Sequence, residues 1–155
     1  MSPNRKRSAV VAVSLLALAA AGGAVAATKA EQAIAARQAG YKQIGGAFKA
    51  INDQLKSGSP DTKLIAANAK TLHDLSLKVP AWFPKGSGPE AGVKTKAKAA
   101  IWTDSAKFAA AAKAFQTESA KLQQVALKGD VGAIQAQVRA VGGSCGGCHK
   151  PFREE

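Results

Sequence analysis

Two cysteines and a histidine stand together near the end of the chain, in the pentapeptide Cys145-Gly146-Gly147-Cys148-His149. A c-type haem uses this spacing: two thiols form thioethers with the vinyl groups, and the adjacent imidazole ligates the iron. The chain has no other cysteine, and the small residues around the motif leave room for a flat macrocycle. The sequence therefore predicts one covalent haem c, attached through Cys145 and Cys148, with His149 as the axial iron ligand.

Three other chemistries of paired cysteines fit this sequence less well. A thioredoxin-like dithiol opens a helix within a βαβ unit, whereas this motif ends a helical pattern in a chain without a strand pattern. A structural zinc site needs four ligands, and the only further histidine is His73. A disulfide within one helical turn conflicts with disulfide geometry. Covalent haem is the interpretation that remains.

The motif belongs to the last of four stretches in which large apolar residues recur every three or four positions, as on the buried face of a helix. Both cysteines fall on that face. Ser59 is expected to cap the second helix, with Pro60 at its first position. The four stretches predict an all-α, antiparallel up-down four-helix bundle that carries its haem near the C-terminus. We expect the helices over residues 34–55, 61–78, 104–128 and 130–152, with a short extra helix near 93–102.

Two irregularities in this pattern indicate a ligand. Arg37 falls on the apolar face of the first helix, and a buried charge needs a partner, which an anionic ligand could supply. Gly45 and Gly46 interrupt the same helix at a cost of about 1 kcal/mol each relative to alanine, which fits the close approach of a neighbouring helix or a flat ligand. In the long proline-rich connection after the second helix, Trp82 and Phe83 are expected to pin the loop onto the bundle.

Length and composition set the outer bounds. A chain of 155 residues allows one ordinary domain. Only 5% of the residues are aromatic while alanine is abundant, which favours helices over a β-sandwich or barrel. Two cysteines cannot build a disulfide-stapled miniprotein, and two histidines exclude a histidine-rich metal cluster.

The first 27 residues have the pattern of a secretion signal. A basic stretch at residues 5–7 precedes an apolar run over residues 9–21, and Ala24-Val25-Ala26 offers small residues where a signal peptidase cleaves. The apolar run is too short to span a bilayer, although an uncleaved anchor is the alternative. We expect residues 1–27 to be a cleaved Sec signal peptide and residues 28–155 to form the bundle, located in the periplasm without a membrane span.

The remaining chain is strongly basic. Removal of residues 1–27 takes away three basic and no acidic residues, so the net charge falls from +12 to +9. Such a charge suits nucleic acid, an anionic membrane or an acidic protein. Export argues against nucleic acid, and so does the lack of aromatic residues among the lysines. For most of these lysines, a solvated helix face is sufficient explanation.

The chain after residue 27 resembles the class II cytochromes c, the four-helix family that includes cytochrome c′ and its low-spin relatives. The resemblance rests on the motif at residues 145–153 (CGGCHKPFR), on residues 37–41 (RQAGY), and more weakly on residues 83–86 (FPKG) and 101–102 (IW). It implies that Cys145 and Cys148 hold the vinyl carbons and that His149 is the proximal ligand. It further places Arg153 beside the proximal haem face and Arg37 against a haem propionate. Many family members form dimers through their first two helices.

The sixth ligand of the iron, on the side opposite His149, decides the function. Low-spin relatives use a methionine on the first helix, but the only methionine here is Met1, which leaves with the signal peptide. The equivalent position holds Tyr41, with Ile44 one turn later. A neutral tyrosine is a poor ligand, so we expect five-coordinate, high-spin iron. The alternative is a bis-histidine haem with His73 as the sixth ligand.

Two functions follow from these expectations. The first is a periplasmic electron carrier whose basic surface, with Lys85, Lys94, Lys96 and Lys98 as candidates, docks an acidic redox partner. The second is a protein that binds nitric oxide or carbon monoxide at an open iron position. An enzyme is not expected, because no base, nucleophile or carboxylate pair can be placed near the haem.

Overall fold

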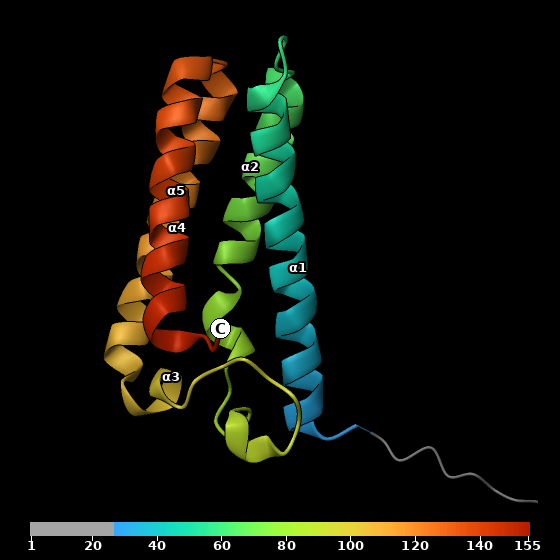
Figure 1. Ribbon diagram of the computed structural model, residues 1–155, viewed down its shortest axis with the longest axis vertical. Coiled ribbons are helices and arrows are strands. Elements are labelled where there is room, and N and C mark those ends of the chain that lie inside the picture. Colours follow the sequence, from blue (N-terminus) through green and yellow to red (C-terminus); the bar gives the residue numbers. More distant parts are fainter. Residues whose placement is uncertain (1–26) are drawn as a thin grey trace, which may run out of the picture.

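The computed structural model describes residues 27–155, and the predicted signal peptide lies outside this range apart from its last residue. The bundle consists of α1 (Lys29–Lys56), α2 (Thr62–Ser76), α4 (Ser105–Lys128) and α5 (Val131–Phe152), which run up and down in turn (Figure 1). The turns η1 (Val79–Trp82) and η2 (Pro89–Ala91) and the short helix α3 (Ala100–Thr103) lie in the connection between α2 and α4. The predicted all-α four-helix bundle is confirmed. None of the helices in this range is long and apolar enough to cross a bilayer.

Each long helix begins at a side chain that caps its first turn. Thr28 and Glu31 form a capping box on α1, and the Asp61 carboxylate accepts hydrogen bonds from the first turn of α2. Asp104 and Asp130 cap α4 and α5 in the same way. These side chains satisfy backbone N–H groups that have no partner inside the helix.

The predicted start of the second helix is wrong by two residues. Ser59 does not cap α2, and Pro60 precedes the helix instead of opening it. The Asp61 carboxylate accepts from the N–H groups of both Lys63 (2.9 Å) and Leu64 (3.1 Å). A charged acceptor that satisfies two N–H groups caps better than a serine hydroxyl that satisfies one.

The short helix predicted near residues 93–102 is also largely wrong. Only Ala100–Thr103 is helical; Val93 is a bend, and residues 94–98 form an extended segment that bridges Arg153 through Ala97. This segment lies against the C-terminal tail, where Lys98 N donates to the Phe152 carbonyl (3.0 Å) and Glu154 N donates to the Lys96 carbonyl (2.8 Å). The tail thus satisfies backbone groups that would otherwise favour a helix.

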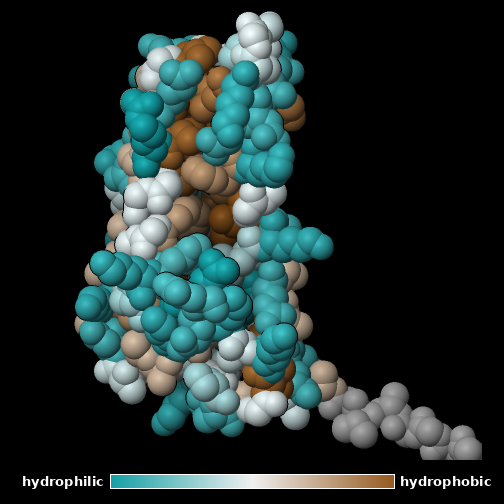
Figure 2. All heavy atoms as spheres, in the orientation of Figure 1, coloured by the Kyte–Doolittle hydropathy of each residue, from teal (hydrophilic) through white to brown (hydrophobic). Residues whose placement is uncertain are grey.

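The apolar stripes meet inside the bundle as predicted. Helices α1 and α2, α2 and α4, and α4 and α5 pack extensively, whereas α1 and α5 meet at only a few points. Figure 2 shows apolar side chains in the furrow between α1 and α5, flanked by hydrophilic ones. The bundle is therefore open along one side. The largest fully buried apolar side chains are Ile34, Ile51, Ile65, Leu72, Leu122, Ile134 and Val141.

Trp82 and Phe83 pin the loop to the bundle as expected. Both rings are partly buried against the core, and Trp82 lies on α1 at Gly40. A Cβ on Gly40 would overlap the indole ring of Trp82. Gly45 and Gly46 differ, because a Cβ there would have no neighbour within 4 Å. No neighbouring helix therefore explains these two glycines.

We predict opposite effects of alanine at two glycines of α1. Gly40→Ala should lower the free energy of unfolding by about 1–3 kcal/mol, because Trp82 must shift. Gly46→Ala is the matched control and should raise it by about 0.5–1 kcal/mol through helix propensity alone. Denaturant unfolding of the haem-loaded proteins measures both. A Gly40→Ala variant as stable as the parent would contradict this packing.

Candidate haem site

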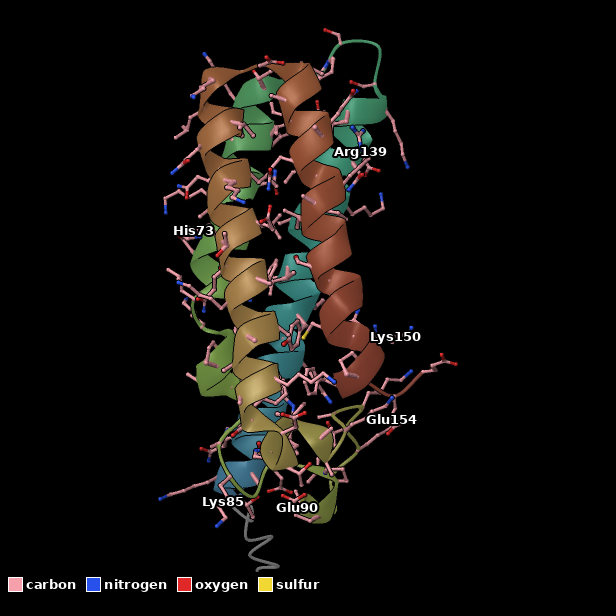
Figure 3. The ribbon with its side chains drawn as sticks, turned by 90° about the vertical axis from the view of Figure 1, so that its left-hand side faces the viewer. His73, Lys85, Glu90, Arg139, Lys150 and Glu154 are labelled. Atoms are coloured by element: carbon pink, nitrogen blue, oxygen red, sulfur yellow. The ribbon has the colours of Figure 1, made fainter. Side chains whose placement is uncertain are left out.

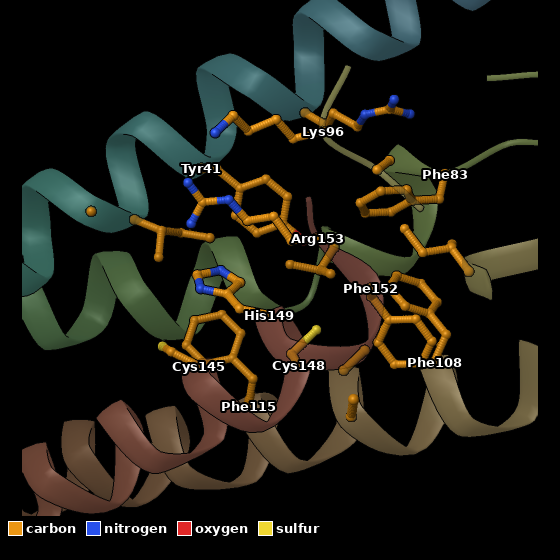
Figure 4. Close-up of a pocket in the computed structure, with 18 of the residues that line it drawn as sticks. Tyr41, Phe83, Lys96, Phe108, Phe115, Cys145, Cys148, His149, Phe152 and Arg153 are labelled. Atoms are coloured by element: carbon orange, nitrogen blue, oxygen red, sulfur yellow. The ribbon is translucent and has the colours of Figure 1, made fainter. Parts of the chain in front are cut away.

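A cavity of about 1070 Å³ lies between α1, α4 and α5. This volume is at the upper end of the range of about 300–1,000 Å³ found for ligand and cofactor sites. Most of its wall is apolar, and α4 contributes the rings of Phe108 and Phe115 (Figure 4). The cavity therefore suits a large, flat and mainly apolar molecule.

Helix α5 brings the three residues of the motif to this cavity. Positions three and four apart share one face of a helix, so Cys145, Cys148 and His149 all line the cavity (Figure 4). Phe152, one turn later, is buried and anchors the end of the helix in the core. The two cysteines are half-buried, as predicted from their place in the apolar stripe.

The pKa values of the two thiols and their place in the helix argue against a redox-active dithiol. Both cysteines are free, and burial raises the pKa of each thiol. A redox-active dithiol needs the opposite shift and the start of a helix, whereas this motif lies in the last turns of α5. Within residues 27–155, no three His, Cys, Asp or Glu side chains gather as metal ligands. The thiols fit attachment to a carbon group of a bound molecule.

His149 is placed to serve as a metal ligand. Burial lowers its pKa, and the nearby Arg153 guanidinium lowers it further. The neutral imidazole that metal binding requires is thereby favoured. Arg153 directly follows α5, donates its backbone N–H to the His149 carbonyl (2.9 Å) and also lines the cavity. The structure thus brings Arg153 and His149 together.

Arg37 is a buried cation, and no carboxylate of residues 27–155 forms an ion pair with it. Its side chain is 3% exposed and lines the cavity. Nη1 donates to the carbonyl (2.7 Å) and Oγ (3.0 Å) of Ser87, and Nη2 donates to Oγ1 of Thr95 (2.6 Å). The guanidinium also lies 5.0 Å from the centre of the Phe83 ring. Neutral groups hold Arg37 in place without cancelling its charge, so the cavity favours an anionic group.

Tyr41 and Ile44 line the cavity from α1, and Figure 4 shows Tyr41 on the side opposite α5. The Tyr41 ring packs edge-on against Trp82, with ring centres 5.4 Å apart, and lies 6.3 Å from Phe83. Burial raises the pKa of Tyr41 well above its ordinary value. The phenol therefore stays neutral at physiological pH.

His73 stands apart from these residues. It lies on α2 and is absent from the cavity wall (Figure 3). The structure thus gives no support to His73 as a sixth ligand.

The sequence analysis missed one part of the wall. The extended segment contributes residues 94–97 to the cavity. The alternation of Lys94, Thr95, Lys96 and Ala97 was the available signal, because a period of two indicates extended chain.

The fold and the site together define a class of protein, a four-helix bundle with a covalently bound haem near its C-terminus. A sequence model of the family described as Cytochrome C' matches residues 32–153, and the chain belongs to this family. Its cofactor is one covalent haem c.

Individual relatives agree with this assignment. Cytochrome c' of Rhodospirillum rubrum is 39% identical over 109 residues, which cover 70% of this chain and 72% of the relative. The crystal structure of cytochrome c' from Rubrivivax gelatinosus superposes with a TM-score of 0.75 at 34% identity, over 82% of this chain and 98% of that one. A nitric oxide complex of a mutant cytochrome c prime from Alcaligenes xylosoxidans gives 0.74 at 31% identity, over 83% and 98%.

We predict that replacing both cysteines removes covalent attachment. In Cys145→Ser/Cys148→Ser, acid–butanone should extract the haem, which the parent protein retains. Ser144→Ala is the matched control, because Ser144 lines the same cavity and adjoins Cys145 but carries no thiol that could form a thioether. Retention of haem by the double variant would contradict the assigned attachment.

Proposed function

We propose that this protein is a periplasmic haem redox protein that passes single electrons and has no catalytic activity of its own. When bound, the haem supplies a one-electron change between ferric and ferrous iron. The observation that carries the proposal is the cavity wall. Cys145, Cys148 and His149 face it from α5, and no side chain suited to ligate iron at neutral pH faces them from α1.

Cys145 and Cys148 hold the haem by two thioethers, and His149 is the proximal ligand. Their positions on one face of α5 support this assignment. Arg153 lies beside His149, where its positive charge favours the neutral imidazole. Arg37 compensates a propionate, because its buried cation lines the cavity without a carboxylate partner.

Tyr41 and Ile44 occupy the distal side and leave the iron five-coordinate and high-spin. A tyrosine ligates iron as the phenolate, and the raised pKa of Tyr41 keeps it protonated. The single methionine of the chain, Met1, lies within the proposed signal peptide.

The proposed location rests on residues 1–27, which we assign to a cleaved Sec signal peptide. Pairing of two bundles through α1 and α2 remains a prediction from the family resemblance.

A second function is favoured by one observation. Tyr41 and Ile44 line the cavity from α1 and offer no iron ligand at neutral pH, which suits the binding of a small neutral gas to a haem iron on that side. The Alcaligenes xylosoxidans relative was crystallised with nitric oxide. Tight binding of nitric oxide or carbon monoxide would favour this gas-binding role, whereas salt-sensitive electron-transfer rates would favour the redox role.

Substitutions at Tyr41 test the distal assignment. Tyr41→Met should convert the haem to low spin, with a sharp ferrous α-band that no longer responds to carbon monoxide, because a thioether sulfur then faces the iron. Tyr41→Leu is the control and should remain high-spin and bind carbon monoxide. Visible spectra of the reduced proteins measure both. A sharp α-band in the parent protein would refute the vacant position.

The role of His73 has its own test. His73→Ala should leave the visible spectrum unchanged in both oxidation states, because His73 lies outside the cavity wall. A change from low to high spin in this variant would instead identify His73 as the sixth ligand.

A further inference from the structure

The extended segment beside the cavity carries a row of lysines. Lys94 and Lys96 are exposed, while Thr95, Ala97 and Lys98 are partly buried. Thr95 accepts the hydrogen bond from Arg37 (2.6 Å), and Ala97 packs against the core. Successive side chains of an extended segment point to opposite sides. Lys94, Lys96 and Lys98 therefore lie on one side, and we call them the lysine row.

The backbone of this row is fixed on both flanks. On the α1 side, Gln38 Nε2 donates to the Lys94 carbonyl (3.2 Å). On the other side, the tail after α5 pairs with Lys96 and Lys98 and forms a bridge between Ala97 and Arg153. A fixed backbone lowers the entropy cost of presenting these charges to a partner.

Positive charge gathers at the cavity, with only partial compensation by Glu90, which acts on Arg37, and by the tail carboxylates beside Arg153. Five permanently cationic side chains and no carboxylate line the cavity. The two propionates of a haem would offset only part of this charge. The five are Arg37, Lys42, Lys94, Lys96 and Arg153.

The acidic residues of the chain are mostly committed elsewhere. Four act at helix N-termini, three pair with a lysine on their own helix, and one accepts from a loop N–H. Only two carboxylates of the ten lie near the lysine row, on the tail beside Lys98, Lys150 and Arg153. The four at helix N-termini are Glu31, Asp61, Asp104 and Asp130, and the three paired with a lysine are Asp53, Asp74 and Glu118. Glu90 accepts from the loop N–H, and Glu154 and Glu155 lie on the tail.

The sequence-based patch needs one correction. Lys85 lies with Glu90 at the end of the molecule, apart from Lys150 and Glu154 (Figure 3). The row is also not the solvated helix face that was the alternative, because residues 94–98 are extended.

The chemistry of this surface favours a protein partner over a membrane. Binding at a membrane interface combines basic residues with large apolar side chains that insert. Within residues 27–155, the exposed large apolar residues are Leu64, Leu77 and Leu127, and none belongs to the extended segment or to the tail. A surface of fixed cations at the edge of an apolar cavity suits an acidic protein surface.

We propose that the lysine row, together with Lys42, Lys150 and Arg153, is the surface on which an acidic redox protein docks to exchange an electron. This inference rests on the proposed redox function and adds the site and the chemistry of the partner. Docking here brings the partner to the cavity that the motif on α5 faces. Electrostatic steering toward such a surface speeds association by a factor of about 10–1,000 at low ionic strength.

Reduction by flavodoxin, an acidic one-electron donor, tests the surface. The anionic flavin hydroquinone gives up one electron and becomes the neutral semiquinone, while ferric iron becomes ferrous. Stopped-flow absorbance of the haem-loaded protein measures the rate. Lys94→Glu/Lys96→Glu should slow the reaction about 10-fold or more at low salt and remove most of its salt dependence.

The matched control is Lys63→Glu/Lys128→Glu, which changes the net charge equally. Lys63 is in the first turn of α2 and Lys128 ends α4, at the end of the bundle away from α3 (Figure 1), and both are exposed. The control should slow the reaction by less than about threefold. Equal losses in both double variants would overturn the proposed surface, since net charge alone would then explain them.

Three further outcomes separate this inference from the redox function. Tight binding of the parent protein to phosphatidylglycerol vesicles, lost in Lys94→Glu/Lys96→Glu, would identify a membrane site and overturn the docking surface. If dithionite and flavodoxin both reduce the parent protein, and the lysine variants are reduced by flavodoxin at the same rate as the parent, the docking surface is overturned but the redox function stands. A haem that dithionite and ferricyanide cannot cycle would contradict the redox function and the surface together.

Discussion

The site depends on the fact that α1 and α5 do not pack against each other along their length. Helices α1 and α5 meet at only a few points, and an apolar cavity of about 1070 Å³ lies between them and α4. Protein interiors are close-packed, and apolar side chains gain little from facing water or empty space. A bound molecule must therefore supply the missing contacts. The haem of this family has the shape and apolar character to do so, and α5 carries two thiols that fit its covalent attachment.

The same cavity accounts for the unusual distribution of charge. Arg37 is held by Ser87, Thr95 and the Phe83 ring, none of which cancels its charge. Most carboxylates cap helices or pair with lysines on their own helices. Most of the cationic groups around the cavity therefore have no ion-pair partner among the described carboxylates, which suits the propionates and the acidic partner that we propose.

The sequence predicted the features that depend on interactions between residues close together in the chain. The haem motif, the apolar stripes and the burial of Arg37 follow from spacing within single helices, and the structure agrees. The extended segment at residues 94–98 was missed, because its hydrogen bonds come from Phe152 and Glu154, more than fifty positions away. The start of α2 was misplaced, because Asp61 and Ser59 both suit a cap and only the backbone geometry separates them. The distal place of Tyr41 came from the family resemblance, since periodicity alone cannot identify which helix faces the iron.

Electron paramagnetic resonance of the ferric, haem-loaded parent protein tests the central claim most directly. The account holds that α5 supplies the only ligand and that Tyr41 leaves the opposite side of the iron vacant. It predicts an axial high-spin signal at neutral pH. A low-spin rhombic signal would show a second strong ligand on the iron and would contradict the account.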